Sequence, residues 1–475
     1  MNKTILFSFI LFFLGFQTYG HSGKAKYHVI IDTDGGIDDL RSICLLLASP
    51  EFEVIAITST DGNIPPAETA VKINGLLIDF HHEGIPVGKG KKVSEAYPGW
   101  STICAETAWG PDTPHFKPPS AFSLIQQAIQ LEAEPVTLIC LGGLTNIVPL
   151  LSHADLTSKI ESINWFLNDN CQFNRKVDTM AFQKVKKADV PFRIISSKDK
   201  NQVYFNTELC KAINSLDTRY ASKIAEISNE AFYFKKISEN KMTLWDDLVP
   251  FFLLHPKWFS NSDVENIYYF KKEKVDSLYL AYTDILQNPY RNENKEFDPF
   301  PGNPGLFGDD FSPHVEKIIQ KHGYPEFRAT VITNELHGHL GIYSIIGAKM
   351  GIRAREYFNI GVDEMLVTTF TGKKPPLSCM NDGIQVSTGA TMGHGLIEIS
   401  EDTEKLARAT FRFKEGKVTL TLKNEIWNKI KDDIGDAIAE HGNLTADYWK
   451  QVRKLAINYW VEFDRYTIFT MEKDL

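Results

Sequence analysis

Short apolar runs alternate with longer amphipathic stretches through the first half of the chain. The apolar runs predict buried strands of a parallel sheet, because both faces of such strands are covered; they lie at residues 28–31, 54–59, 86–88, 136–141 and 192–195. The stretches between them predict helices, most clearly at residues 40–48, 67–81 and 120–131. This alternation is typical of an α/β fold, with an open, mainly parallel, Rossmann-like sheet covered by helices on both faces.

The composition changes between residues 288 and 311, where Asn, Pro, Gly and Asp dominate. Such a stretch predicts a linker between a first domain, residues 21–287, and a smaller α+β domain, residues 312–400. A small-residue helix is expected within the second domain, at residues 345–357. Residues 401–475 are expected to form a C-terminal extension, with a hairpin turning at 414–416 and an amphipathic helix at 445–463.

Residues 1–20 have the features of a secretory signal peptide. Lys3 precedes an apolar stretch at residues 5–16 that is too short to span a bilayer, and small residues precede an expected cleavage after Gly20. We therefore expect an exported protein, periplasmic or secreted, with no membrane segment after signal cleavage. An uncleaved membrane anchor is the alternative.

Net charge and cysteine content narrow the class of protein further. The formal net charge is −9, which argues against a nucleic-acid partner. The six cysteines are irregularly spaced and match no disulfide framework. The sequence leaves the oligomeric state open, and a homo-oligomer is compatible with it.

Four carboxylates follow the first predicted strand within eight residues: Asp32, Asp34, Asp38 and Asp39. They are expected on a turn at the carboxyl end of that strand, where open α/β sheets place their ligands. Their charges would repel one another without a cation, and oxygen ligands favour a hard ion such as Ca²⁺. An EF-hand is excluded, because its twelfth position would be Ile43 rather than Glu.

Several motifs, in order along the chain, resemble the inosine–uridine nucleoside hydrolase family. The acidic loop reads Asp-Thr-Asp-Gly-Gly-Ile-Asp-Asp, with Gly35 at the position of the family's Pro. The other motifs are Thr-Asp-Gly-Asn at 60–63, Leu-Thr-Asn-Ile at 144–147 and Trp-Asp-Asp-Leu at 245–248. The resemblance covers roughly residues 25 to 285 and implies cleavage of an N-glycosidic bond.

The resemblance also implies a role for each matching position. The proposed Ca²⁺ ligands are Asp34, Asp39, Asp246 and the carbonyl of Thr145, while Asp38 would be the general base for a Ca²⁺-bound water. Asn63 and Asn174 would hold the ribose hydroxyls. Asp32 is expected to support the ligands rather than to bind the ion. One cation that orients both water and ribose suits a reaction with an oxocarbenium-like transition state.

Two positions depart from the family pattern. Trp245 stands where many members have a His that protonates the leaving base, and Trp cannot do this. It could instead stack on a purine, with Trp109 or Trp100 on the opposite face; the alternative is that Trp245 is an ordinary core residue. Gln172 replaces a Glu that contacts the ribose, which puts catalytic efficiency or substrate identity in doubt.

A second set of motifs follows the predicted linker. Leu-His-Gly-His-Leu-Gly at 336–341 and Cys-Met-Asn-Asp-Gly-Ile-Gln at 379–385 are similar to the FmdE-like domain, which takes its name from formylmethanofuran dehydrogenase. The resemblance implies a site for Zn²⁺ or another transition metal, with His337, His339 and Cys379 as ligands and His394 as an outside candidate. Ala390 stands where the family has a second Cys, and no cysteine follows Cys379. A redox role is therefore not expected.

These observations predict a two-domain enzyme that acts on a small nucleoside. The expected reaction is Ca²⁺-dependent hydrolysis of ribonucleosides to free base and ribose, with a preference for purines. One alternative is a hydrolase of a modified nucleoside or another N-riboside. Another is a non-catalytic riboside-binding protein with a metal-binding C-terminal domain; the retained base Asp38 argues against it.

Overall fold

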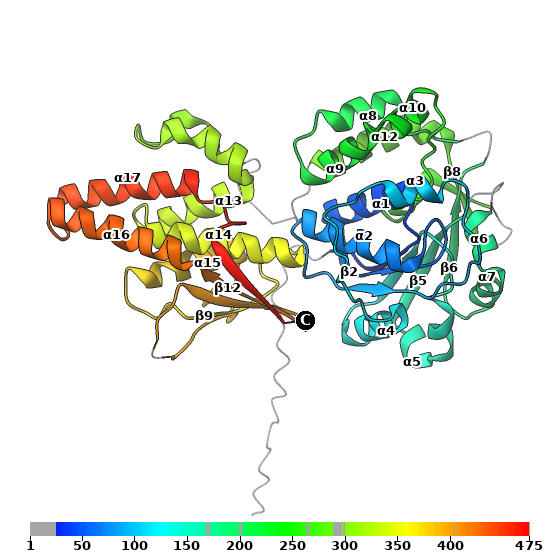
Figure 1. Ribbon diagram of the computed structural model, residues 1–475, viewed down its shortest axis with the longest axis horizontal. Helices are drawn as coiled ribbons and strands as arrows, with labels where there is room; N and C mark the ends of the chain where they lie inside the picture. Colours follow the sequence, from blue (N-terminus) through cyan, green and yellow to red (C-terminus); the bar gives the residue numbers. More distant parts are fainter. Residues whose placement is uncertain are drawn as a thin grey trace, which may run out of the picture.

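The chain folds into two domains that lie side by side in the computed structural model (Figure 1). The structure describes residues 25–167, 172–198, 202–262, 266–287, 297, 300–402 and 404–474. The predicted signal peptide and part of the predicted linker lie outside these residues. In the part of the chain that is described, no helix combines the length and the apolar character that a bilayer span needs.

The first domain is built on an eight-stranded sheet in the order β3-β2-β1-β4-β5-β6-β8-β7. All neighbouring strands are parallel except the edge strand β7, which is antiparallel to β8. The strands are β1 Tyr27–Thr33, β2 Phe52–Ser59, β3 Val87–Lys89, β4 Val136–Cys140, β5 Ile160–Phe166, β6 Phe192–Ser196, β7 Phe259–Ser262 and β8 Ile267–Phe270. The predicted parallel α/β fold is thereby confirmed.

Helices cover both faces of this sheet. They are α1 Ile37–Ala48, α2 Pro66–Asp79, α3 Ser101–Glu106, α4 Ala121–Leu131, α5 Ala154–Thr157, α6 Phe173–Val177, α7 Thr179–Lys186, α8 Thr207–Asn214, α9 Arg219–Ser228, α10 Ala231–Ser238, α11 Leu248–Leu254 and α12 Val275–Gln287.

The second domain has a five-stranded sheet in the order β10-β9-β11-β12-β13. Its elements are α13 Val315–His337, α14 Ile342–Phe358, β9 Leu366–Thr369, α15 Met380–Thr388, β10 Ile397–Ile399, β11 Arg408–Phe413, β12 Gly416–Leu422, α16 Asn424–His441, α17 Ala446–Glu462 and β13 Phe469–Asp474. Residues 401–475, which the sequence presents as an extension, thus supply three strands of this sheet. Trp460 of α17 is buried in the same hydrophobic core as α14.

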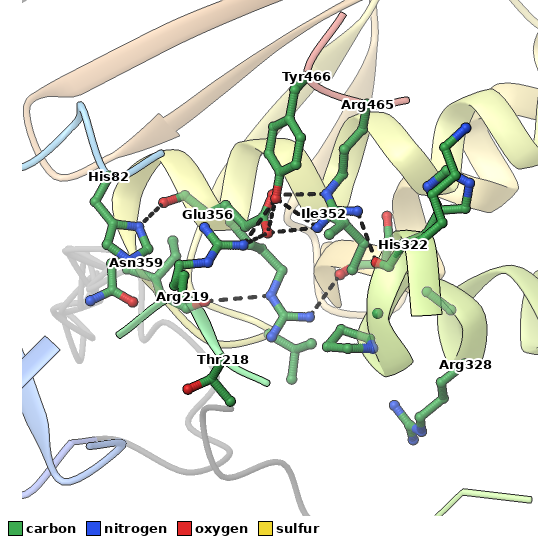
Figure 2. A pocket seen from close by; sticks show the side chains of 18 of the residues that line it. His82, Thr218, Arg219, His322, Arg328, Ile352, Glu356, Asn359, Arg465 and Tyr466 are labelled. Atoms are coloured by element: carbon green, nitrogen blue, oxygen red, sulfur yellow. Dashed lines mark hydrogen bonds and ion pairs between the residues drawn. The ribbon is translucent and has the colours of Figure 1, made fainter. Parts of the chain in front are cut away.

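Polar contacts join the two domains. Arg353 forms an ion pair with Glu83 at 2.9 Å, and Lys414 contacts both Glu53 and Glu132. At the same interface, Glu356 accepts hydrogen bonds from Arg219, Arg465 and Tyr466 (Figure 2). Because Glu53 and Glu132 lie where β2 and β4 begin, the second domain docks at the edge of the sheet opposite the acidic loop.

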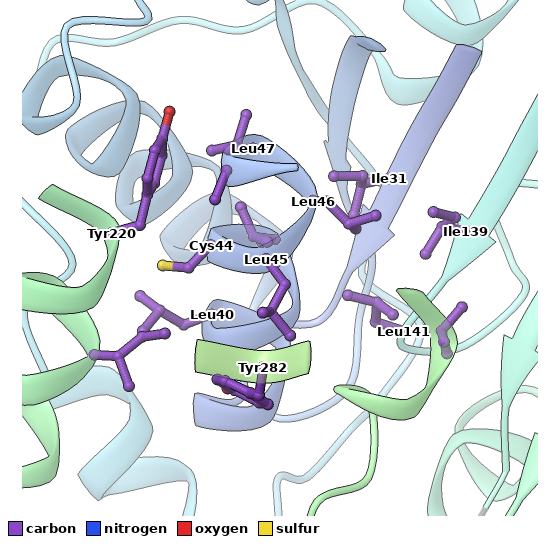
Figure 3. Close-up of a cluster of buried hydrophobic side chains, with 14 of the residues drawn as sticks. Ile31, Leu40, Cys44, Leu45, Leu46, Leu47, Ile139, Leu141, Tyr220 and Tyr282 are labelled. Atoms are coloured by element: carbon purple, nitrogen blue, oxygen red, sulfur yellow. The ribbon is translucent and has the colours of Figure 1, made fainter. Parts of the chain in front are cut away.

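Helix α1 is the rigid element that carries this acidic loop. Its residues from Asp39 to Ala48 are all buried, since it packs against the sheet on one side and against α9 and α12 on the other (Figure 3). Leu40 and Leu45 contact side chains of both layers and are fully buried. This packing explains why the helix is apolar on every side, and it fixes the position of the carboxylates in its first turn.

Candidate functional site

The acidic loop connects the carboxyl end of β1 to the first turn of α1. Asp39 folds this loop back on itself: one carboxylate oxygen accepts from the Thr33 hydroxyl at 2.5 Å and from the Asp34 N–H at 3.1 Å. The other oxygen accepts from the Gly36 N–H at 3.2 Å. Gly35 has a φ of +88°, which a Pro could not adopt, so the conformation of this loop fits glycine at that position.

Three of the predicted site carboxylates converge at this edge of the sheet. Oxygens of Asp38, Asp39 and Asp246 lie within 4.8 Å of one another, although Asp246 comes from the far end of the domain sequence. Burial, followed by repulsion from Asp38, raises the pKa of Asp39 to about 7. The pKa values of Asp34 and Asp246 are raised well above normal by burial and then by the neighbouring carboxylates. The cluster therefore needs a positive charge to remain ionised.

Two carboxylate oxygens of the residues expected to bind Ca²⁺ have no hydrogen-bond partner. They are Asp34 Oδ2 and Asp246 Oδ1, and both are buried. The other carboxylate oxygen of Asp34 accepts a hydrogen bond from Asn63 Nδ2 at 2.6 Å. This bond fixes the orientation of the carboxylate and therefore the direction in which the unpartnered oxygen points. A Cβ on Gly62 would lie 2.1 Å from that orphaned oxygen, which makes glycine necessary beside it. Buried oxygens without partners, and oxygen donors only, fit a hard divalent cation.

The remaining residues predicted to bind substrate or ion lie in loops at the same edge. Thr145 follows β4, and its hydroxyl donates to Asp178 at 2.9 Å. Asn174 donates from its amide to the carbonyl of Leu141, just after β4, at 2.8 Å. Gln172 begins α6 with a left-handed φ of +46° and accepts from Arg175. The contact of Asn174 anchors its side chain to the end of β4, where open α/β sheets bind ligands.

The tryptophans proposed to stack on a base have different environments. Trp109 is only 2% exposed and belongs to the hydrophobic core. Its ring therefore has no face open to a ligand, and the prediction that Trp109 binds substrate is wrong. Trp100 is 46% exposed, donates from Nε1 to Asn63 Oδ1 at 2.7 Å and contacts Phe173 edge to face. Trp245 is half-buried, and its indole N–H is buried without a partner.

A buried ion pair beneath the cluster was not predicted from the sequence. Arg41 of α1 binds both carboxylate oxygens of Asp247 at 2.9 Å, and Tyr282 donates to the same carboxylate. Burial raises the pKa of Asp38, and the positive charge of Arg41 opposes this increase. The only available signal was a single basic residue within the apolar sequence of α1, three positions after Asp38.

The second predicted metal site is only partly assembled. His337 Nδ1 lies 2.7 Å from Asp382 Oδ2, and its Nε2 is buried without a partner. The His339 ring lies 4.5 Å from the His337 ring. Among the described residues, however, the ligand atoms of His337, His339 and Cys379 do not form a group within 4.8 Å.

Two further residues define the surroundings of this second site. Asp382 was missed in the sequence, although it stands three positions after Cys379; its charge raises the pKa of that thiol, secondary to burial. The outside candidate His394 is half-exposed and pairs instead with Asp363 at 2.7 Å. Orphaned His337 Nε2, with Nδ1 held by a carboxylate, is the arrangement that metal-binding histidines commonly show.

Two family models match consecutive parts of the chain. The family described as "Inosine-uridine preferring nucleoside hydrolase" matches residues 29–335, and "FmdE, Molybdenum formylmethanofuran dehydrogenase operon" matches residues 336–461. Similar curated proteins include a pyrimidine-specific ribonucleoside hydrolase RihA from Shewanella sp. (strain ANA-3), 32% identical over 42% of this chain and 68% of its own length. The RihA of an Escherichia coli strain is 28% identical over 49% and 81%, respectively.

Solved structures of two nucleoside hydrolases match about half of the chain at low sequence identity. A purine-preferring ribonucleoside hydrolase from Gardnerella vaginalis has a TM-score of 0.47 and 18% identity, covering 55% of this chain and 99% of its own. An inosine-guanosine nucleoside hydrolase has a TM-score of 0.47, 19% identity and coverages of 56% and 99%. On the family matches and the curated relatives, the chain belongs to the inosine–uridine nucleoside hydrolase family, hydrolases that act on N-glycosyl compounds, and it carries a C-terminal FmdE domain.

Proposed function

We propose that this protein uses Ca²⁺ to hydrolyse the N-glycosidic bond of ribonucleosides, releasing free base and ribose. The observation that carries the proposal is the buried carboxylate cluster at the carboxyl edge of the sheet, together with the orphaned oxygens of Asp34 and Asp246. The sequence of residues 1–20 adds the proposal that the mature enzyme acts after export, in the periplasm or outside the cell.

The proposed ligands are Asp34, Asp39, Asp246 and the carbonyl of Thr145. The orphaned oxygens of Asp34 and Asp246 support this set, because a buried carboxylate oxygen without a partner is costly unless a cation satisfies it. When bound, Ca²⁺ would neutralise the carboxylates, acidify a coordinated water and orient the ribose hydroxyls.

Asp38 is the proposed general base. It lies in the first turn of α1, within 4.8 Å of the oxygens of Asp39 and Asp246, where its carboxylate can accept a proton from the attacking water. Burial raises its pKa and makes it a stronger base than an exposed aspartate. The positive charge of Arg41 opposes this effect and favours the ionised base that the reaction requires, whereas the charge of Asp247 adds to the effect of burial.

Asn63 and Asn174 are the proposed ribose contacts. Asn63 is held from both ends of its amide, by Asp34 and by Trp100, so its orientation is fixed before substrate binds. The amide nitrogen of Asn174 is fixed by the Leu141 carbonyl. Side chains oriented in advance lose little entropy when they bind the sugar.

Purine ribonucleosides are the proposed preferred substrates. Trp245 supports this choice, because its half-buried indole has an unpartnered N–H and directly precedes the proposed ligand Asp246. Stacking on such a ring gains more with a two-ring base than with a pyrimidine. The curated relatives bear pyrimidine-specific names, so a direct comparison of the two substrate classes is the required test.

The FmdE domain is proposed to hold Zn²⁺ or another transition metal through His337, His339 and Cys379. The buried, unpartnered Nε2 of His337 supports this, and the nearby Asp382 would fix the tautomer that leaves Nε2 free to bind. The histidine and thiolate donors suit a borderline metal rather than Ca²⁺.

The Asp38→Asn variant tests the hydrolase proposal. We expect turnover to fall by roughly 10²- to 10⁴-fold, the usual contribution of a positioned general base, while Ca²⁺ binding persists through the other ligands. Asp155→Asn, at an exposed position on α5, is the matched control and should leave turnover unchanged. Unchanged turnover in Asp38→Asn would remove Asp38 from its proposed role.

A further inference from the structure

A cavity of about 330 Å³ lies between the two domains (Figure 2). The first domain lines it with residues at the start of α9, including Thr218 and Arg219, and with His82. The second domain lines it with parts of α13, α14 and the segment after α17. The cavity is distinct from the hydrolase site: Asn359 on its wall bonds to the Leu47 carbonyl at the carboxyl end of α1. Asp38 and Asp39 lie at the other end of this 12-residue helix, which spans about 18 Å.

The walls of this cavity carry more positive than negative charge. Five side chains are basic, and they are Arg219, Lys321, Arg328, Arg355 and Arg465. Among the described residues that line it, two are acidic, Asp217 and Glu356.

The carboxylate of Glu356 already forms ion pairs with two arginines of the cavity wall. It binds Arg219 at 2.6 Å and Arg465 at 2.8 Å, and their charges hold its pKa well below normal although burial opposes this. Arg465 also pairs with Glu326, which lies behind the wall.

The two histidines of the cavity have different surroundings. The pKa of His322 is lowered to about 4, chiefly by burial, so this ring is neutral at pH 7. Both ring nitrogens of His82 have partners, the Glu356 carbonyl and the Tyr220 hydroxyl, each at 2.6 Å. The positive charge of the cavity therefore comes chiefly from its arginine and lysine side chains.

Helix α9 adds a second attraction for an anion. This ten-residue helix begins at Arg219, and its first residues line the cavity. The amino end of a helix carries partial positive charge and unpaired N–H groups. Thr218 caps only the Ala221 N–H in this first turn.

We propose that this interdomain cavity binds a phosphate group, either free or as a small phosphate monoester. A phosphate carries nearly two negative charges and three strong acceptor oxygens, which suits guanidinium groups that approach from several directions. A carboxylate would neutralise less of the charge. The volume accommodates a phosphate with a small sugar attached. Because Arg219 and Arg355 come from different domains, the bound anion would bridge the domain interface.

Isothermal titration of the mature chain, residues 21–475, with inorganic phosphate and with ribose 5-phosphate tests this proposal. We expect saturable binding of at least one of the two, with affinity about tenfold to a hundredfold weaker in Arg355→Gln and in Arg328→Gln, the usual effect of removing one charge-assisted hydrogen bond. Two separate variants keep the test valid if one of them fails to fold. Arg412→Gln, at an exposed position on β11, is the matched control and should bind like the wild type.

A second experiment distinguishes phosphate binding in this cavity from phosphate binding at the two proposed metal sites. After metal removal by a chelator, phosphate binding should persist unchanged. Loss of binding on chelation would assign the phosphate to a metal centre and overturn the proposal. Absence of saturable binding, or equal binding by the wild type and both arginine variants, would also overturn it. Tighter binding of ribose 5-phosphate than of phosphate would identify a monoester as the ligand, and equal affinity would identify free phosphate.

Discussion

The stabilising effect of Ca²⁺ on the first domain is expected to grow with pH. Without a cation, the buried carboxylates favour the protonated form in the folded state. The pKa of Asp39 is raised to about 7, against about 3.9 in an unfolded chain, and this difference corresponds to about 4 kcal/mol of destabilisation above pH 7. The folded metal-free protein binds more protons than the unfolded chain between these values, so its stability falls as pH rises from about 4 to about 7.

A bound cation removes this penalty, because it stabilises the ionised carboxylates. The difference in melting temperature between Ca²⁺-loaded and metal-free protein should therefore be small at pH 5 and large at pH 8. A penalty of about 4 kcal/mol corresponds to roughly 8 to 16 °C for a domain of this size. The comparison of the two forms at each pH also cancels groups that titrate in both, such as His81, whose pKa is lowered to about 4.

Differential scanning calorimetry at pH 5, 6, 7 and 8 measures this effect on the first-domain transition. The Asp39→Asn variant should show a weaker pH dependence, because it removes one of the carboxyl groups that titrate. The exposed-site variant Asp155→Asn should behave like the wild type. A difference in melting temperature that is constant from pH 5 to 8, or larger at pH 5, would show that the carboxylates do not titrate in this way.

Three further changes test other residues of the two sites. In Gly62→Ala, the added Cβ would lie 2.1 Å from Asp34 Oδ2, so we expect kcat/KM and Ca²⁺ affinity to fall by roughly tenfold to a hundredfold; wild-type values would show that this oxygen is not a ligand. In Trp245→Ala, kcat/KM should fall by roughly tenfold to a hundredfold for inosine but less for uridine, and equal losses would argue against stacking. In Asp382→Ala, zinc affinity measured by competition with a chelating dye should fall by about tenfold to a hundredfold, and unchanged affinity would contradict support of His337 by this carboxylate.

Much of the fold is visible in the sequence because its signals are local. Strands β1, β2, β3, β4 and β6 match the short apolar runs that predict them, and the amphipathic helix expected at residues 445–463 corresponds to α17. Strands β5 and β8 were not predicted, and β5 carries Glu161, Ser162 and Asn164 among its apolar residues. The placement of β13 is not local, because it pairs with β12 only after two intervening helices. The sequence therefore presents residues 401–475 as an extension, whereas in the structure they complete the second sheet.

In the candidate site, too, the sequence indicates local features but not contacts between distant positions. The carboxylates of the acidic loop stand out in the sequence because four of them follow one strand. The Arg41–Asp247 pair joins positions 206 residues apart, and no local pattern indicates it. Trp109 is buried in the core, and its neighbour Gly110 lies close to Gly75 of α2; only the packed structure shows these contacts. A tryptophan that packs in the core and one that faces a ligand have the same sequence signature.

Release of free ribose from a panel of nucleosides is the most direct test of the proposed function. The mature chain, residues 21–475, would be assayed with inosine, guanosine, adenosine, uridine and cytidine, with and without a Ca²⁺ chelator. We predict ribose release that the chelator abolishes and that added Ca²⁺ restores, faster from the purine nucleosides than from the pyrimidine ones. Release that is insensitive to the chelator, or no release from any nucleoside by the Ca²⁺-loaded protein, would contradict the proposed function.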